Sequence, residues 1–280
     1  MSIVVAFAVG FLAVLLALLA AQGVLATPVL ERENYRGHRL PTAAGILLVL
    51  AVLGIEGVRT ASGALDLGDP GITGARALVL LAVVGFGFLG LVDDLVGDGS
   101  DRGFRGHLGA LRRGRVTTGM AKLAFGAALS LVLVSGAHGE TGIEPFVDAL
   151  LVALAANLAN LLDRAPGRTT KVALVCYVPV ALVCGTASIG VATAVVAGGA
   201  LGLLPEDLRE RLMLGDTGAN VLGAVLGLAI VLETSTATRT GVAVALLALN
   251  LVSEVVSFGR VITMVPPLRA FDRLGRIEAQ

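Results

Sequence analysis

Acidic side chains stand at the ends of three apolar runs, where a charge near the membrane is costly and therefore tends to be functional or paired. Asp93 and Asp94 end the segment GLVDD, Asp163 ends NLANLLD, and Asp216 stands in MLGDTGAN. Mg²⁺ prefers oxygen ligands and is typically held by one or two carboxylates together with substrate phosphates. These acids together predict a divalent-cation site at one face of a membrane.

The polar residues around the acids fit phosphate chemistry. Asn157, Asn160 and Asp163 are spaced three residues apart, so they share one face of a helix. We expect Asp216 to lie just before a helix N-terminus, where free N–H groups favour an anion. A single Asp at a helix end is more often only a cap, but the convergence of several acids favours metal-assisted phosphoryl transfer. Basic residues that could contact phosphate are Lys122, Arg102, Arg105, Arg112, Arg113 and Lys171.

The elements that must position these residues are membrane helices. The 280 residues are 56% hydrophobic and only 15% charged, and the apolar residues fall in runs long enough to cross a bilayer. We therefore expect an all-α, polytopic bundle that forms one membrane domain over residues 1–280, with its first run kept as a helix rather than removed as a signal peptide. The nine expected spans are Ile3–Leu25, Thr42–Val58, Ala75–Val92, Thr118–Ala137, Ile143–Leu162, Val172–Cys184, Ala187–Leu204, Ala219–Leu232 and Gly241–Val256.

The loop charges predict the orientation. Loops after the odd-numbered spans, together with the C-terminal segment, hold 17 Lys and Arg, and the opposite loops hold 3. Because basic loops stay in the cytoplasm, we expect the N-terminus outside and the C-terminus inside. All the candidate acids then face the cytoplasm. The three histidines and two cysteines lack ligand spacing, so we expect no zinc site, and nothing indicates a nucleic-acid partner.

Five segments, in this order, resemble the polyprenyl-phosphate N-acetylhexosamine-1-phosphate transferase superfamily, which includes the phospho-N-acetylmuramoyl-pentapeptide transferases. They are PTAAGI from Pro41, GLVDDLVGD, HLGALRRGRVTTGMAKL with Lys122, NLANLLD and MLGDTGANVLG. The resemblance covers nearly the whole chain. It implies a phosphoglycosyltransferase of the glycosyltransferase family 4 type, in a plasma membrane, with its active site on the cytoplasmic face and a possible homodimer.

The implied reaction is Mg²⁺-dependent transfer of a sugar 1-phosphate from a UDP-amino sugar to polyprenyl phosphate, with release of UMP, in cell-envelope glycan synthesis. Asp216 would bind the metal. One of Asp93 and Asp94 would activate or orient the lipid phosphate, and the sequence leaves open which one. The other implied residues are Asp163 at the catalytic site, and Asn157, Asn160 and Lys122 as contacts to the nucleotide diphosphate.

The chain departs from the superfamily pattern where the sugar nucleotide is recognised. Pro166 replaces a second Asp after NLANLLD, Ala44 replaces a Gly, and the C-terminal segment lacks the usual His-rich loop. We hypothesise that Arg269, Arg273 and Arg276 replace those histidines. The alternatives are a weakly active or inactive homologue with a scaffold or lipid-binding role, a transporter, and a CDP-alcohol phosphotransferase. The last two are disfavoured because the acids lie at one face and the longer Asp-rich signature is absent.

Overall fold

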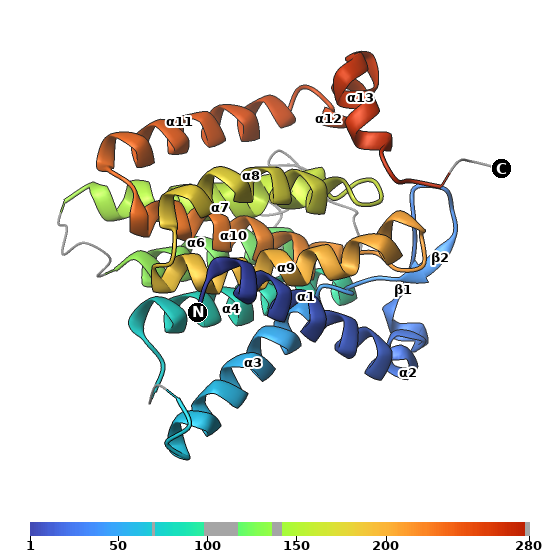
Figure 1. Ribbon diagram of the computed structural model, residues 1–280. Helices are drawn as coiled ribbons and strands as arrows, with labels where there is room; N and C mark the ends of the chain where they lie inside the picture. The colour runs from blue at the N-terminus through green and yellow to red at the C-terminus, as the bar shows by residue number, and fades with distance from the viewer. Residues whose placement is uncertain (69–70, 98–116, 136–141, 278–280) are drawn as a thin grey trace.

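Long helices packed side by side make up most of the chain in the computed structural model, which describes residues 1–68, 71–97, 117–135 and 142–277 (Figure 1). Charge-free runs form helices in a membrane because every backbone N–H and C=O must then be satisfied within the segment. The helices are α1 (Ile3–Ala20), α2 (Gln22–Leu25), α3 (Ile46–Ala64), α4 (Gly74–Val96), α6 (Thr118–Val134), α7 (Glu144–Leu162), α8 (Arg168–Cys184), α9 (Ser188–Leu208), α10 (Gly215–Glu233), α11 (Thr236–Ser253), α12 (Phe258–Met264) and α13 (Pro266–Arg273).

Seven helices in the described part of the chain are long and apolar enough to cross a membrane, and they are α1, α3, α4, α7, α9, α10 and α11. The chain is therefore a multi-pass helical membrane protein. Helices α6 and α8, of 17 residues each, occupy the places of the fourth and sixth expected spans. Each of the nine expected runs contains a helix within the described residues, but the number of spans and the orientation stay predictions.

Helices α9 and α10 lie at the centre and are the most deeply buried of the seven. Helix α1 packs along α9, and α10 packs against α7 and α4. Glycines allow the closest of these approaches: a Cβ at Gly10 would overlap the backbone of Val195, and a Cβ at Gly198 would overlap that of Phe7. Small residues bring membrane helices together in this way because packing, rather than exclusion of water, drives their association.

A short hairpin is the β-structure that the described residues contain beside the helices. Strand β1 (Glu31–Glu33) pairs antiparallel with β2 (Arg39–Pro41). The Asn34 side chain closes the turn by accepting hydrogen bonds from the backbone N–H groups of Arg36 and His38, at 2.8 and 3.0 Å. Asx turns of this kind are local side-chain chemistry that a hydropathy pattern does not report. The hairpin lies at the same end of the bundle as α13 (Figure 1).

Candidate active site

Lys122 joins two of the predicted acids. Its Nζ lies 3.1 Å from Oδ2 of Asp93 and forms a second, shorter ion pair with Oδ2 of Asp216. The three side chains come from the end of α4, the second turn of α6 and the first turn of α10, and each is 13–27% exposed. Three helix ends that are far apart in the sequence therefore meet at one half-buried point.

Asp94, from α4, caps the first turn of α10, whose own N-cap residue Leu214 makes no side-chain cap hydrogen bond. Oδ1 of Asp94 accepts a hydrogen bond from the backbone N–H of Asp216 at 3.0 Å, and its Oδ2 accepts two from Thr217, from the N–H at 2.9 Å and the hydroxyl at 2.7 Å. A carboxylate on the free N–H groups of a first turn is stabilised by those bonds and by the helix dipole. Asp94 thus positions Asp216, its neighbour in the site.

One sequence expectation needs correction at this point. Helix α4 ends at Val96, so Asp93 and Asp94 lie within its last turn, at the helix end where they were expected. Helix α10 begins at Gly215, so Asp216 lies inside the first turn rather than just before it. The run of apolar residues underestimates both helices because a capped polar turn continues each of them at the membrane surface.

Glycines let α3, α4 and α10 meet closely enough to form the site. A Cβ at Gly90 would overlap the backbone carbonyl of Asp216, and one at Gly45 would overlap the backbone of Gly218. Gly215 has a φ of +74°, and a Cβ there would lie 2.6 Å from Oδ2 of Asp94. Gly215, the first glycine of the GDTG segment, is therefore required because its φ is positive and because a Cβ would crowd the Asp94 carboxylate.

The polar residues of α7 are brought to the site only in part. Asn157 donates a hydrogen bond from Nδ2 to Oδ1 of Asn250 on α11, at 2.7 Å. The Nδ2 atom of Asn160 is buried and has no hydrogen-bond partner among the described residues. Asp163 lies one residue beyond α7 and is half-buried. The shared helix face predicted for these residues exists, but it does not place all three against Lys122.

The acids affect one another electrostatically. Burial, followed by the negative charges of Asp207, Asp216 and Asp94, raises the pKa of Asp163 well above its ordinary value. A carboxyl group next to several others resists ionisation unless a cation neutralises them. The arrangement therefore favours binding of positive charge in addition to the ammonium group of Lys122.

Asn220 is a site residue that sequence reasoning missed. It lines a small cavity of about 30 Å³ together with Lys122 and Asn157, and its buried Nδ2 has no hydrogen-bond partner among the described residues. The signal was available, since Asn220 follows Asp216 by four residues and so shares its helix face.

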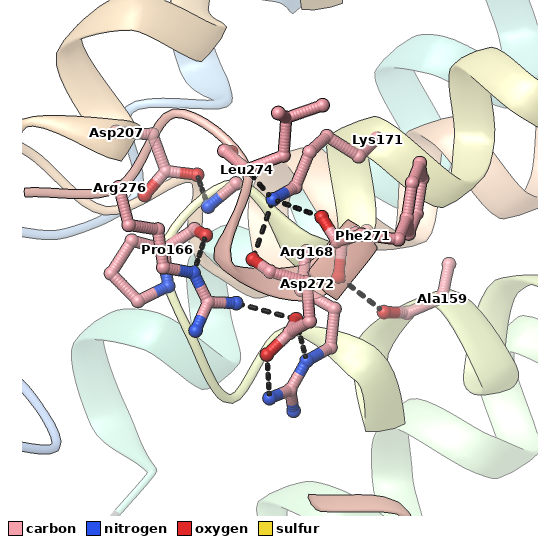
Figure 2. A network of polar contacts seen from close by, with 11 residues as sticks. Ala159, Pro166, Arg168, Lys171, Asp207, Phe271, Asp272, Leu274 and Arg276 are labelled. Atoms are coloured by element: carbon pink, nitrogen blue, oxygen red, sulfur yellow. Dashed lines mark hydrogen bonds and ion pairs between the residues drawn. The ribbon is translucent and has the colours of Figure 1, made fainter. Parts of the chain in front are cut away.

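A network of buried charges holds the C-terminal helix against the turn after Asp163 (Figure 2). Asp272 of α13 accepts two hydrogen bonds from the guanidinium group of Arg168, at 2.8 and 3.0 Å, and one from Arg276 at 2.5 Å. Arg276 also donates to the backbone carbonyl of Pro166 at 2.9 Å. Pro166, which departs from the superfamily pattern, is therefore part of this clamp.

Lys171 completes the clamp from α8. Its Nζ donates to three backbone carbonyls at the end of α13, those of Phe271, Asp272 and Leu274, at 3.1, 2.6 and 3.0 Å. A cation on the free carbonyls of a last turn is favourable. Lys171 was predicted to contact phosphate, but its ammonium group instead holds the end of α13.

The C-terminal arginines divide into two kinds. Arg276 is bound within the clamp, whereas Arg269 and Arg273 are exposed on α13. The hypothesis that all three replace the missing histidines stays a prediction, and the structure gives Arg276 a second task. The predicted phosphate contacts Arg102, Arg105, Arg112 and Arg113 lie outside the described residues.

The donor chemistry of the site fits Mg²⁺ held jointly with substrate. Among the described residues no three His, Cys, Asp or Glu side chains form a closed metal cage. Asp93 and Asp216 do converge on one cation, the ammonium group of Lys122. Two carboxylates with remaining positions left to phosphate oxygens and water are a typical set for Mg²⁺.

Comparisons with known proteins agree with this arrangement. Residues 76–234 match the family described as Glycosyl transferase family 4. A phospho-N-acetylmuramoyl-pentapeptide-transferase of Moorella thermoacetica is 32% identical over 70% of this chain and 67% of its own length. A protein of the same name from Desulforamulus reducens is 28% identical over 81% and 72%, and one from Desulfitobacterium hafniense is 27% identical over 69% and 62%. The chain thus spans less than two thirds of the Desulfitobacterium protein.

Proposed function

Because the chain belongs to glycosyl transferase family 4, we propose that it transfers a sugar 1-phosphate from a UDP-activated amino sugar to polyprenyl phosphate. The observation that carries the proposal is the meeting of Asp93, Lys122 and Asp216 at adjoining helix ends. The relatives named above, phospho-N-acetylmuramoyl-pentapeptide-transferases, support a cell-wall precursor as product.

In the proposed reaction an oxygen of the acceptor phosphate attacks the phosphorus that carries the sugar. A new P–O bond forms, the P–O bond to UMP breaks, and UMP leaves with the electron pair. Both reactants are anionic, so alignment and charge neutralisation supply most of the acceleration. Mg²⁺ bound by Asp216 with Asp93 beside it would neutralise the diphosphate. The ammonium group of Lys122 adds a second fixed positive charge.

We assign the two neighbouring acids different roles. Both oxygens of Asp94 are used in capping α10, so Asp94 positions the first turn of α10, which carries Asp216. Asp93 faces Lys122 instead, where an acceptor phosphate attracted by the ammonium group would lie. Asp93 is therefore the residue proposed to orient or deprotonate the acceptor. Asp93→Asn should lower kcat with little change in thermal stability, whereas Asp94→Asn should lower both.

The test of the proposal is UMP release by the purified chain in detergent, with Mg²⁺, undecaprenyl phosphate and a panel of UDP-amino sugars. UDP-N-acetylmuramoyl-pentapeptide and UDP-N-acetylglucosamine are the first donors to compare. Release that requires both the lipid and the metal supports the proposal and identifies the donor. No release with any donor, from protein with a cooperative unfolding transition, would favour the inactive homologue with a scaffold or lipid-binding role.

A further inference from the structure

A groove with an apolar wall and two arginines lies away from the catalytic acids. The groove, of about 710 Å³, opens between the C-terminal half of α1, the short α2 and the last turns of α9. In Figure 1 these elements are the blue helices and the golden helix that run toward the same end of the bundle. Most of its lining is apolar and includes Leu15, Leu18, Leu19, Pro205 and Leu212. Its volume far exceeds that of the cavity beside Lys122.

The mouth of the groove is basic. Arg209 and Arg211 line it with 54% and 63% of their side chains exposed, and both contact one carboxylate, that of Glu206. Each arginine reaches Glu206 through Nη1. Two positive charges and one negative charge leave a net charge of +1 in the lining of the groove, whose other residues are uncharged and, apart from Gln22, apolar. The remaining guanidinium nitrogens can bind an anion that approaches from the membrane surface.

The groove is separate from the catalytic acids. Its floor includes Pro41 and Leu212, which belong to two segments joined by backbone hydrogen bonds. The N–H of Met213 donates to the carbonyl of Pro41 at 2.7 Å, and the N–H of Ala44 donates to the carbonyl of Met213 at 3.1 Å. None of the residues that line the groove is among those that contact Lys122 or Asp94. A molecule in the groove would therefore lie beside the segment that leads into α10, whose first turn carries Asp216, without occupying the active site.

We propose that this groove binds an anionic glycerophospholipid, with an acyl chain along α1 and the phosphate at Arg209 and Arg211. Basic pockets between membrane helices at a membrane surface bind anionic lipid head groups, and the charge of the mouth complements one phosphodiester. A soluble anion would leave the leucine-lined wall without an apolar partner. A zwitterionic lipid would bring its own cation to the arginines and gain less from them.

The experiment is native mass spectrometry of the full chain released from detergent, titrated with phosphatidylglycerol or with phosphatidylcholine. The variant is Arg209→Gln with Arg211→Gln. The matched control is Arg164→Gln with Arg260→Gln, which removes the same charge from two exposed positions outside the groove. Substitutions at exposed positions like these normally leave folding intact.

The wild type and the control should bind one phosphatidylglycerol more tightly than phosphatidylcholine, and the groove variant should lose about tenfold in affinity for phosphatidylglycerol alone. Equal binding of both lipids by all three proteins would overturn the proposal and indicate a nonspecific lipid shell.

Three further outcomes would also overturn it. Equal competition by inorganic phosphate would assign the mouth to a soluble anion, and displacement by undecaprenyl phosphate would assign the groove to the acceptor. A loss of dimer mass in the groove variant, without a change in lipid binding, would assign it to a second copy of the chain. Because none of these readouts measures UMP release, failure of the proposed catalytic function would leave this test unaffected.

Discussion

Asp272→Asn keeps the size of the side chain and removes its charge, so it tests whether the C-terminal helix is held by the clamp. Asp272 and Arg168 are each 7% exposed, and the carboxylate accepts hydrogen bonds from Arg168 and Arg276. The asparagine keeps one acceptor oxygen but turns an NH₂ group toward a guanidinium. The substitution therefore breaks the ion pair without changing the volume of the side chain at position 272.

The cost follows from the geometry. Removing one partner of a buried ion pair costs about 3–5 kcal/mol because the other charge stays buried. Here α13 can detach and let water reach Arg168, so the lower value, about 3 kcal/mol, limits the loss. That value weakens docking of the helix by about 150-fold. Arg273→Gln, on the same helix but exposed, should change stability by less than about 0.5 kcal/mol.

Hydrogen exchange followed by mass spectrometry is the assay. In Asp272→Asn the amides of residues 266–274 and of the turn at 164–168 should both lose about two orders of magnitude in protection. Loss of protection in α13 alone would show that the clamp does not support the turn beside Asp163. Unchanged protection in both segments would refute the reasoning that the buried charges hold the helix.

The same clamp predicts a pH dependence. Burial alone would raise the pKa of Asp272, but the hydrogen bonds from Arg168 and the charges of Arg168, Arg276 and Lys171 outweigh it and lower the pKa below its ordinary value. A group with a lowered folded-state pKa stabilises above its unfolded-state pKa, about 3.9, and that stabilisation is lost as the pH falls through the folded-state value. The wild type and Asp272→Asn should therefore differ in thermal stability at pH 7, and the difference should shrink as the pH falls below about 3.9 toward the folded-state pKa of Asp272.

Three other substitutions test the active site. Gly90→Ala should destabilise the chain by about 1–3 kcal/mol and lower activity, because its Cβ overlaps the backbone of α10; Gly57→Ala, with open space around it, should be neutral or slightly stabilising in thermal unfolding. Asp94→Asn should cost about 2 kcal/mol in unfolding free energy through the lost cap, and an unchanged melting temperature would contradict its capping role. Lys122→Gln should lower the melting temperature without Mg²⁺ and increase the rise that Mg²⁺ produces, since two carboxylates lose their shared cation; an equal rise in the wild type would argue against metal binding there.

The membrane helices and the site acids could be predicted from sequence because each depends on local composition. Long charge-free runs have few alternatives to a helix in a bilayer, and acids that recur at the ends of several such runs indicate a shared site more strongly than any one of them does. The sequence pattern places the GDTG segment at the start of a helix. It does not predict that Asp94 caps this helix, because two residues that are 122 positions apart leave no periodic signal.

The clamp and the hairpin could not be predicted for a related reason. Asp272 and Arg168 look like ordinary loop charges in the sequence, and the orientation rule already accounts for the arginine. Their pairing depends on where α13 folds back, which is decided by contacts 104 residues apart. Glu210 likewise binds the hairpin residues Asn34 and Tyr35 through tertiary contacts. Propensity and hydropathy report neither kind of contact.

The central claim is that Asp93, Lys122 and Asp216 form a phosphoryl-transfer site, and UMP release by Asp216→Asn tests it most directly. The matched control is Asp66→Asn, an exposed position with a φ of +58° that asparagine tolerates. With undecaprenyl phosphate, Mg²⁺ and the donor that the wild type accepts, Asp66→Asn should match the wild type and Asp216→Asn should lose at least about a hundredfold in kcat. Wild-type UMP release from a folded Asp216→Asn protein would contradict the assignment.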